Sequence, residues 1–203
     1  ILLFGSLVFM NTYALFQTNG LANSNLSVGR YYASATTVGD YALFGGGMAS
    51  SSYSAVVDAY NKSLTRSTPT KLSVTRYVLG ATANENYAIF AGGTNGSVKN
   101  TVDAYNTSLT RITATSLSVA RQNVSATTLG NYMMVVGGND GSTTRYNTVD
   151  MYDKSLTRTT GTPLNVGRYG HGLETVGDYA LVAGGNILAS PYRTNVVEAY
   201  ALI

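Results

Sequence analysis

The sequence predicts an all-β fold built from repeated units of four antiparallel strands, and three recurring features predict it. The first is a glycine pair whose second members are spaced by 46, 45 and 47 residues: Gly47, Gly93, Gly138 and Gly185. The second is an arginine that lies 11 residues before the tyrosine of each glycine phrase: Arg30, Arg76, Arg121 and Arg168. The third is the motif VDAY or a close variant, which ends at Tyr60, Tyr105, Tyr152 and Tyr200. Periods of this length are typical of solenoids and propellers.

Each unit contains strand patterns only. A stretch such as YYASATTV (residues 31–38) leads into a Gly-Asp or Gly-Asn turn, and the apolar stretch YALF or YAIF completes a hairpin. After the glycine pair, a variable loop leads to the VDAY strand, and the phrase NKSLTR or NTSLTR predicts a polar turn. Residues 70–74 (TKLSV) and 115–119 (TSLSV) are expected to form the outermost strand. Four short strands per unit, with no helical periodicity, predict one propeller blade.

The recurring features define a single propeller region over residues 1–203. Complete repeats are predicted at residues 30–75, 76–120 and 121–167, and the repeat at residues 168–203 lacks its outermost strand. Residues 1–29 predict a degenerate partial repeat. Within it, residues 21–28 have the pattern of an outermost strand, which either completes the last blade and closes the ring or belongs to a larger open arc.

The apolar segment at residues 1–16 has two possible interpretations. It is similar to the central part of a signal peptide, but it has no basic segment and no small-residue cleavage site, and it contains Asn11 and Thr12. It is also too short and too interrupted to span a bilayer. We therefore expect two strands there and no membrane insertion.

The order of arginine, apolar strand, glycine pair, variable loop, VDAY and polar turn resembles the kelch repeat. The closest copy is RYGHGLETVGDYALVAGG (residues 168–185), and the resemblance extends from Arg30 to Tyr200. It implies a kelch-type β-propeller or a fragment of one. The tryptophan that usually follows the polar turn is missing, and Ser67, Ile112 and Thr159 stand near that position. The nearly identical phrases AYNKSLTR (residues 59–66) and AYNTSLTR (residues 104–111) resemble the kelch-like arrays of bacterial and phage proteins more than the tryptophan-bearing repeats of animal ubiquitin-ligase adaptors.

Residues that recur in every unit are interpreted as scaffold. A phosphate-binding loop requires glycines that lead into a helix, and a P-loop requires a Lys-Ser or Lys-Thr pair, neither of which follows Gly47. We expect the glycine pairs to let neighbouring backbones approach near the centre of the ring. The repeat arginines are expected to pair with the recurring acids Asp58, Asp103, Asp150 and Glu198. A second set of arginines is expected on solvated turns: Arg66, Arg111 and Arg158.

The residues available for chemistry argue against an enzyme. The chain has no cysteine and one histidine, and that histidine, His171, is interpreted as structural because sister repeats have Ala33, Leu79 and Val124 there. No Gly-x-Ser-x-Gly elbow is present. Residues 139–141 (NDG) predict a turn, since one carboxylate makes a poor Ca²⁺ site. We expect no cofactor and no metal. A carbohydrate-active enzyme completed by sequence outside the chain and an intracellular protein-interaction adaptor remain alternatives.

Charge and composition bear on partners and location. The net charge is +3 and 11% of the residues are charged, but the basic residues are spread singly along the chain, so no nucleic-acid binding is expected. The chain is rich in Ser, Thr, Asn and Tyr and has several Asn-x-Ser/Thr sequons. This composition favours an extracellular, cell-surface or virion location, in a bacterial or viral protein, over the cytoplasm.

The loops after the glycine pairs differ in length and sequence from one repeat to the next, whereas the residues on either side of them recur in every repeat. Variable loops on a rigid scaffold predict a binding face, although drift in unselected loops produces the same contrast. The expected partner is a protein or a glycan, and membership of a larger assembly remains an open alternative. The candidate binding residues in these loops are Tyr53, Lys99, Asn139, Asp140, Arg145, Tyr146, Tyr192 and Arg193.

Overall fold

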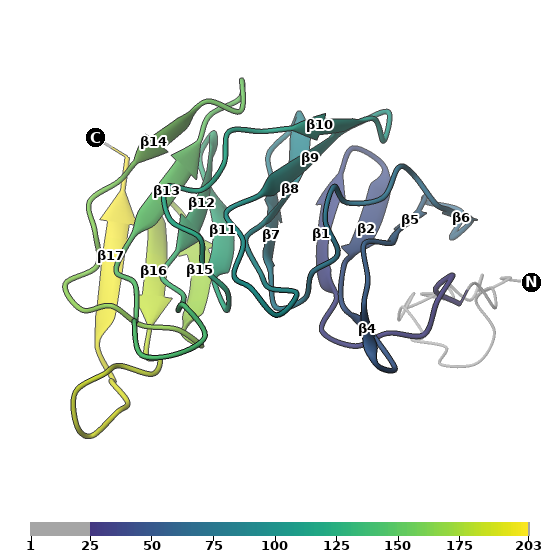
Figure 1. Ribbon diagram of the computed structural model, residues 1–203. Coiled ribbons are helices and arrows are strands. Elements are labelled where there is room, and N and C mark those ends of the chain that lie inside the picture. The colour runs from purple at the N-terminus through teal and green to yellow at the C-terminus, as the bar shows by residue number, and fades with distance from the viewer. Residues whose placement is uncertain (1–24, 203) are drawn as a thin grey trace, which may run out of the picture.

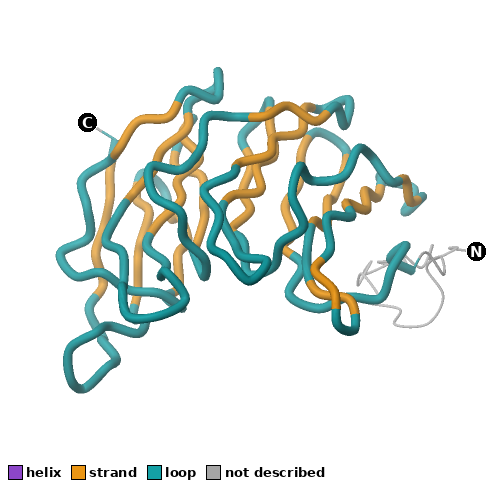
Figure 2. Tube along the Cα trace, viewed as in Figure 1, coloured by secondary structure: helices purple, strands orange, loops and turns teal. Residues whose placement is uncertain are grey.

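The computed structural model describes residues 25–202, and this part of the chain consists of strands, turns and loops without a helix (Figure 2). Four antiparallel sheets follow one another along an arc, with the first and fourth sheets at its two ends (Figure 1). The expected all-β fold of four-stranded blades is confirmed. The segment at residues 1–16 and most of the partial repeat predicted at residues 1–29 lie outside the described residues.

Each sheet is a meander in which neighbouring strands run antiparallel. The first sheet contains β1 (Ser34–Val38), β2 (Tyr41–Gly45), β5 (Val57–Tyr60) and β6 (Arg66–Ser67). The second contains β7 (Gly80–Ala83), β8 (Tyr87–Ala91), β9 (Val102–Asn106) and β10 (Arg111–Thr113). The third contains β11 (Ser125–Leu129), β12 (Tyr132–Val136), β13 (Val149–Tyr152) and β14 (Arg158–Thr160). The fourth has three strands, β15 (Gly172–Val176), β16 (Tyr179–Ala183) and β17 (Val197–Ala201), and a small hairpin pairs β3 (Met48–Ala49) with β4 (Ser52–Tyr53).

The hydrophobic core lies between successive sheets. Alternate side chains of the middle strands point to opposite faces, so each inner sheet contributes one face to each of two interfaces. The interfaces are centred on Leu43, Val57 and Phe90, on Ile89, Ala104 and Met133, and on Met134, Val149 and Val182. On the outer face of the fourth sheet Val197 is 58% exposed, whereas Val57, Val102 and Val149 at the same repeat position are almost completely buried. This face has the composition of a blade interface but is uncovered within residues 25–202.

The outermost strand begins earlier than the sequence indicates. The expected strands at residues 70–74 and 115–119 are wrong, and the outermost strands are β6, β10 and β14, at the end of the polar phrase. The segment at residues 70–74 crosses to the second sheet instead, where Ser73 donates hydrogen bonds from N and Oγ to Asp103 Oδ2 (3.0 and 3.1 Å). Leu72 is buried between the first two sheets, and this burial produces the apolar pattern that resembles a strand.

Residues 25–28 make the contact expected of a crossing segment, at the start of the arc. Ser27 N donates to Asp58 Oδ1 (3.1 Å) in the first sheet. The fourth sheet lies at the other end of the arc (Figure 1). Residues 21–24 lie outside the described residues, so the choice between a strand that completes the last blade and a larger open arc stays a prediction.

A buried pair of an arginine and a carboxylate recurs in every sheet, which confirms the expected pairing. The N–O distances are 2.7 Å for Arg30 and Asp58, 2.7 Å for Arg76 and Asp103, 2.8 Å for Arg121 and Asp150, and 2.5 Å for Arg168 and Glu198. Arg76 and Arg121 also donate hydrogen bonds to the strand carbonyls Phe90 O and Val135 O. Each guanidinium therefore has hydrogen bonds in addition to its ion pair with the carboxylate. Burial raises the pKa of Asp58, but hydrogen bonds from Ser27 and Arg30 outweigh burial and leave that pKa below its ordinary value.

The second set of arginines is not confined to solvated turns. Arg111 NH1 donates to Asp103 Oδ1 (3.1 Å), and Arg158 NH1 donates to Asp150 Oδ1 (2.9 Å). Each of these two carboxylates therefore holds a buried arginine on one oxygen and a partly exposed arginine on the other. The expectation of solvated turns is wrong for Arg111 and Arg158, which begin β10 and β14 and share the buried acid of their unit with the repeat arginine.

The glycine pairs have the predicted structural role. A Cβ atom on the first glycine would lie 2.6 Å from Arg76 O at Gly46, 2.5 Å from Arg121 O at Gly92 and 2.6 Å from Arg168 O at Gly137. These three glycines also have positive φ, a conformation that favours glycine. The carbonyl in each contact belongs to the arginine that begins the next unit, so only glycine allows successive units to approach this closely.

His171 is buried against Gly137, the first glycine of the third glycine pair. It is 6% exposed, neither ring nitrogen has a hydrogen-bond partner in the described residues, and its ring packs on Gly137. Burial, with a smaller contribution from the charge of Arg168, lowers the pKa of His171 from 6.5 to about 4. The imidazole is therefore neutral at neutral pH, in agreement with a structural role.

Replacing His171 with leucine, the residue at this position in the second repeat, is expected to increase stability and to remove a pH dependence. Because the folded-state pKa lies below the unfolded one, the histidine lowers stability as the pH falls from about 6.5 towards 4. For the parent chain this loss amounts to about 2 kcal/mol between pH 7 and pH 5. Urea unfolding at the two pH values measures it. A parent and a His171→Leu variant with the same pH dependence would contradict the assignment.

Candidate functional site

The loops after the glycine pairs lie on one side of the arc and have the same backbone arrangement in every sheet. In each sheet the residue after the glycine pair forms bridges to an inner and an outer residue. The inner residues, each directly after a repeat arginine, are Tyr31, Tyr77, Gln122 and Tyr169; the middle ones are Met48, Thr94, Asn139 and Asn186; the outer ones are Tyr53, Val98, Arg145 and Arg193. We call residues 48–54, 94–99, 139–146 and 186–194, with the inner residues, the glycine-loop rim. It forms the lower edge of the arc in Figure 1.

Tyr53 belongs to a cluster of tyrosines that joins the first two sheets. Its ring stacks on Tyr77 with a centroid distance of 5.4 Å and an interplanar angle of 15°. Tyr32 lies 6.1 Å from Tyr77 and 5.0 Å from Tyr31 between ring centroids. Tyr32 is 62% exposed and has φ +54°, a strained conformation for a bulky residue. The rim thus carries a group of aromatic side chains, partly open to solvent, at this end.

Arg145 connects the third and fourth sheets. Its guanidinium carbon lies 5.0 Å from the centre of the Tyr169 ring, Nε donates to Asn186 Oδ1 (3.2 Å), and NH1 donates to Ser142 O (2.9 Å). Arg193 forms a bridge with the same Asn186, so the structure brings these two predicted residues together. The half-buried Arg145 is already bonded on two sides and is available to a partner only through its remaining surface.

Asn139 and Asp140 have different roles in the third loop. Asn139 is 5% exposed, and its Oδ1 accepts hydrogen bonds from Gly141 N (2.8 Å) and Gln122 Nε2 (3.1 Å). Burial and these bonds give Asn139 a part in the structure of the rim, and its contact with a ligand stays a prediction. Asp140 Oδ1 accepts from Ser142 N (2.8 Å) and Thr144 N (3.0 Å), which confirms the predicted turn. The bond from Ser142 is the main cause of the lowered pKa of Asp140.

The other predicted residues divide into scaffold positions and exposed positions. Lys99 and Tyr146 are equivalent and half-buried, and their backbone N–H groups donate to Gly93 O and Gly138 O (2.8 and 2.9 Å). Tyr192 is 61% exposed, and Arg193 next to it is also exposed. Arg193 and Tyr169 line a hollow of about 380 Å³. Of the predicted set, Tyr192 and Arg193 are therefore the most accessible to a partner.

The inner residues of the rim were not singled out by the sequence analysis. Tyr77 and Tyr169 line hollows, and Tyr31 is 51% exposed. A sequence signal for them exists, because three of the four repeat arginines are followed directly by tyrosine. Recurrence alone suggests scaffold, and only the structure places these side chains at the surface of the rim.

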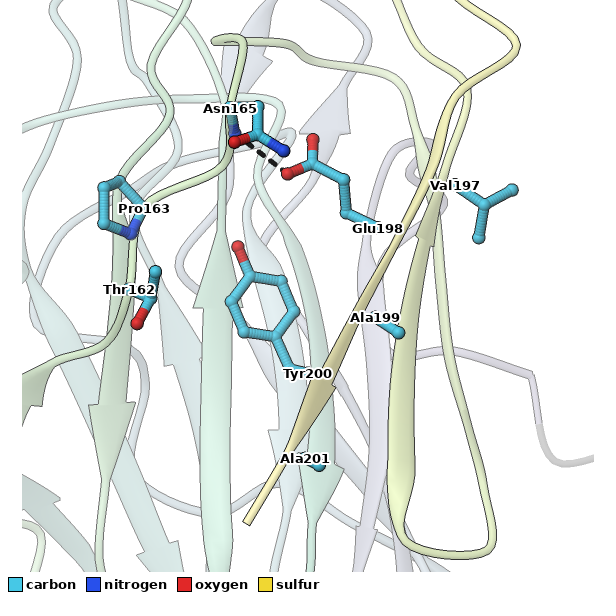
Figure 3. Close-up of a pocket in the computed structure, with 8 residues that line it drawn as sticks. All are labelled: Thr162, Pro163, Asn165, Val197, Glu198, Ala199, Tyr200 and Ala201. Carbon is cyan, nitrogen blue, oxygen red and sulfur yellow. Dashed lines mark hydrogen bonds between the residues drawn. The ribbon is translucent and has the colours of Figure 1, made fainter. Parts of the chain in front are cut away.

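A separate hollow of about 430 Å³ lies along β17 in the fourth sheet (Figure 3). Pro163, Thr162 and Tyr200 line it, and Asn165 N donates to Glu198 Oε2 (2.9 Å). Burial is the main cause that raises the pKa of Tyr200 to about 12. This hollow occupies the side of β17 where the first three sheets have β6, β10 and β14, so it reflects the missing outermost strand of the fourth sheet.

Within residues 25–202 no group of three or more His, Cys, Asp or Glu side chains could hold a metal ion. The same residues contain no apolar helix with the length needed to cross a membrane.

Comparison with known protein families agrees with the arrangement of the sheets. Residues 120–164 match the family model described as Kelch motif. This stretch includes Arg121 and the whole third sheet, β11 to β14, with the glycine pair between β12 and β13. A comparison with curated proteins found no match.

Proposed function

Because this chain has a kelch-repeat, propeller-like fold, we propose that it is a non-catalytic binding module that holds its partner with the glycine-loop rim. Kelch repeats are generally protein-interaction modules, which fits a binding role. The proposed partner is a protein or a glycan.

One observation carries the proposal. The same two bridges hold the rim backbone in every sheet, yet the outer residue is Tyr53, Val98, Arg145 or Arg193. A constant backbone that presents different side chains fits recognition of one extended partner, in which each loop contributes a different contact. Exposed tyrosine and arginine side chains are also the residues that contribute most at protein interfaces.

The chemistry of the titratable groups supports binding without catalysis. The recurring carboxylates of the first three sheets are buried and neutralised by arginine, and Glu198 is paired in the same way. His171 is neutral and buried. A general acid or base must reach a substrate proton, but the three aspartates and His171 are enclosed in the scaffold. Glu198 lines the hollow along β17, where its carboxylate is paired with Arg168.

The proposal is tested by binding to the double variant Tyr192→Ala/Arg193→Ala. The parent chain is screened on a printed glycan array and against a displayed random-peptide library, and each ligand found is titrated. We expect the double variant to bind at least about tenfold more weakly, since exposed aromatic and arginine anchors each contribute about 1 kcal/mol or more. The matched control is Lys62→Ala/Lys154→Ala, which alters exposed groups in turns on the opposite side of the sheets. Equal affinity of the rim variant and the control would reject the rim as the contact surface.

A further inference from the structure

A hollow on the glycine-loop rim, between the second and third sheets, has the lining of a small-ligand site. Its volume of about 460 Å³ lies within the usual range of ligand pockets, about 300–1,000 Å³. The second sheet contributes Tyr77 and Ser97, and the third contributes Gln122, Asp140 and Ser142. The proposed function concerns the glycine-loop rim as a whole and names no ligand for this hollow.

One wall of the hollow is aromatic and held in place. Tyr53 stacks on the Tyr77 ring and Tyr32 lies 6.1 Å from it, so neighbouring rings hold Tyr77 in place where it lines the hollow. The backbone of Tyr77 is fixed as well, because its N–H donates to Thr94 O (3.0 Å) and its carbonyl accepts from Thr94 N (3.1 Å). The flat apolar face of an aromatic ring suits the C–H face of a pyranose sugar.

The opposite wall presents oriented hydrogen-bond acceptors. Two backbone N–H groups, of Ser142 and Thr144, fix Oδ1 of Asp140 and so orient the carboxylate. Gln122 donates from Nε2 to Asn139 Oδ1 (3.1 Å), which orients the side-chain amide and leaves its oxygen as an acceptor. A carboxylate and an amide oxygen together suit neighbouring hydroxyl groups, and bonds to the carboxylate are charge-assisted.

The charge of the lining selects among ligand classes. No lysine or arginine lines the hollow, and the lowered pKa of Asp140, caused mainly by the bond from Ser142 N, keeps that carboxylate ionised at neutral pH. A phosphate or carboxylate ligand would be repelled and would find no cation. A metal ion would find a single carboxylate, which is too few ligands for a Ca²⁺ site. A neutral ligand with several hydroxyl groups and an apolar face remains.

We propose that this hollow binds a neutral saccharide, with the sugar ring against the part of Tyr77 that lines the hollow and hydroxyl groups on Asp140 and Gln122. The inference rests on the proposed function, since it names the ligand class for one part of the same rim. Ser97 and Ser142 supply further hydroxyl groups at the edge of the hollow.

The chain offers a matched pair of variants for the test. Asp153 lies in a turn of the third sheet on the opposite side and accepts from Ser155 N (2.8 Å) and Thr157 N (2.9 Å), the same pattern as Asp140. Asp140→Asn and Asp153→Asn therefore perturb equivalent turns, but only the first changes the hollow. The probes are the methyl glycosides of glucose, galactose, mannose and N-acetylglucosamine, with a methyl sialoside as the acidic probe, titrated by saturation-transfer NMR.

We expect at least one neutral glycoside to bind the parent, with Asp140→Asn about tenfold weaker and Asp153→Asn unchanged. Binding of no neutral glycoside, binding of the sialoside alone, or parent affinity in Asp140→Asn would overturn the inference. The Tyr192→Ala/Arg193→Ala test concerns the fourth sheet. A ligand that depends on those two residues while no glycoside binds the hollow would therefore reject the saccharide and leave the rim proposal intact.

Discussion

Replacing Arg76 with methionine is expected to destabilise the chain by about 3–5 kcal/mol, because it leaves a buried carboxylate without its main partner. Arg76 is completely buried, its NH2 lies 2.7 Å from Asp103 Oδ2, and it also donates to Phe90 O and Thr101 O. Methionine fills a similar volume but supplies none of these hydrogen bonds. The midpoint of urea unfolding measures the loss.

The control for this variant is Lys62→Met. Lys62 and Asp40 are also close, at 2.6 Å, but both side chains are more than half exposed. An exposed ion pair contributes only about 0–1 kcal/mol, so burial and not distance should separate the two variants. If Arg76→Met and Lys62→Met unfold at the same urea concentration, the buried pairs do not stabilise the sheets.

Replacing Gly92 with alanine is expected to have an effect of similar size for a different reason. The new Cβ would lie 2.5 Å from Arg121 O, a backbone atom that cannot move without separating the second and third sheets. Alanine at φ +66° costs about 1–2 kcal/mol by itself. The steric conflict adds about 1–3 kcal/mol. Thermal unfolding of the variant measures the sum.

Gly184→Ala isolates the conformational part of this effect, and the difference between the two variants gives the steric part. Gly184 has the same φ of +66°, but the nearest atom to its Cβ position is Thr194 O at 3.4 Å. In Gly184→Ala we therefore expect only the smaller decrease in the free energy of unfolding, the part that comes from alanine at positive φ. Equal losses in the two variants would show that close approach of successive units is not the reason for glycine at these positions.

Much of the fold could be predicted because its determinants recur. The glycine pairs, the repeat arginines and the VDAY acids mark contacts that every sheet makes, so their spacing defines the sheets. The crossing segments could not be predicted, since the leucine of residues 70–74 is buried between two sheets and has the same apolar pattern as a strand residue. The pattern of apolar residues indicates which side chains are buried. It does not indicate whether a strand of the same sheet or the next sheet along the chain covers them.

The candidate site could be predicted in outline only. The variable loops do form one rim, and Tyr192 and Arg193 are exposed there. The sequence does not show that Gln122 and Gly141 already donate hydrogen bonds to the side-chain oxygen of Asn139. Tyr77 was missed because it follows a scaffold residue and recurrence was interpreted as architecture. The extracellular, cell-surface or virion location stays a prediction.

The most direct measurement of the binding proposal is amide hydrogen exchange with and without a ligand found by the array or the peptide library. We expect protection of backbone N–H groups in the glycine-loop rim, residues 48–54, 94–99, 139–146 and 186–194, and unchanged exchange in the turns at residues 61–65, 106–110 and 153–157. Those turns end β5, β9 and β13 on the opposite side of the sheets. Protection confined to those turns or to the edge of β17, with none in the rim, would contradict the proposed function.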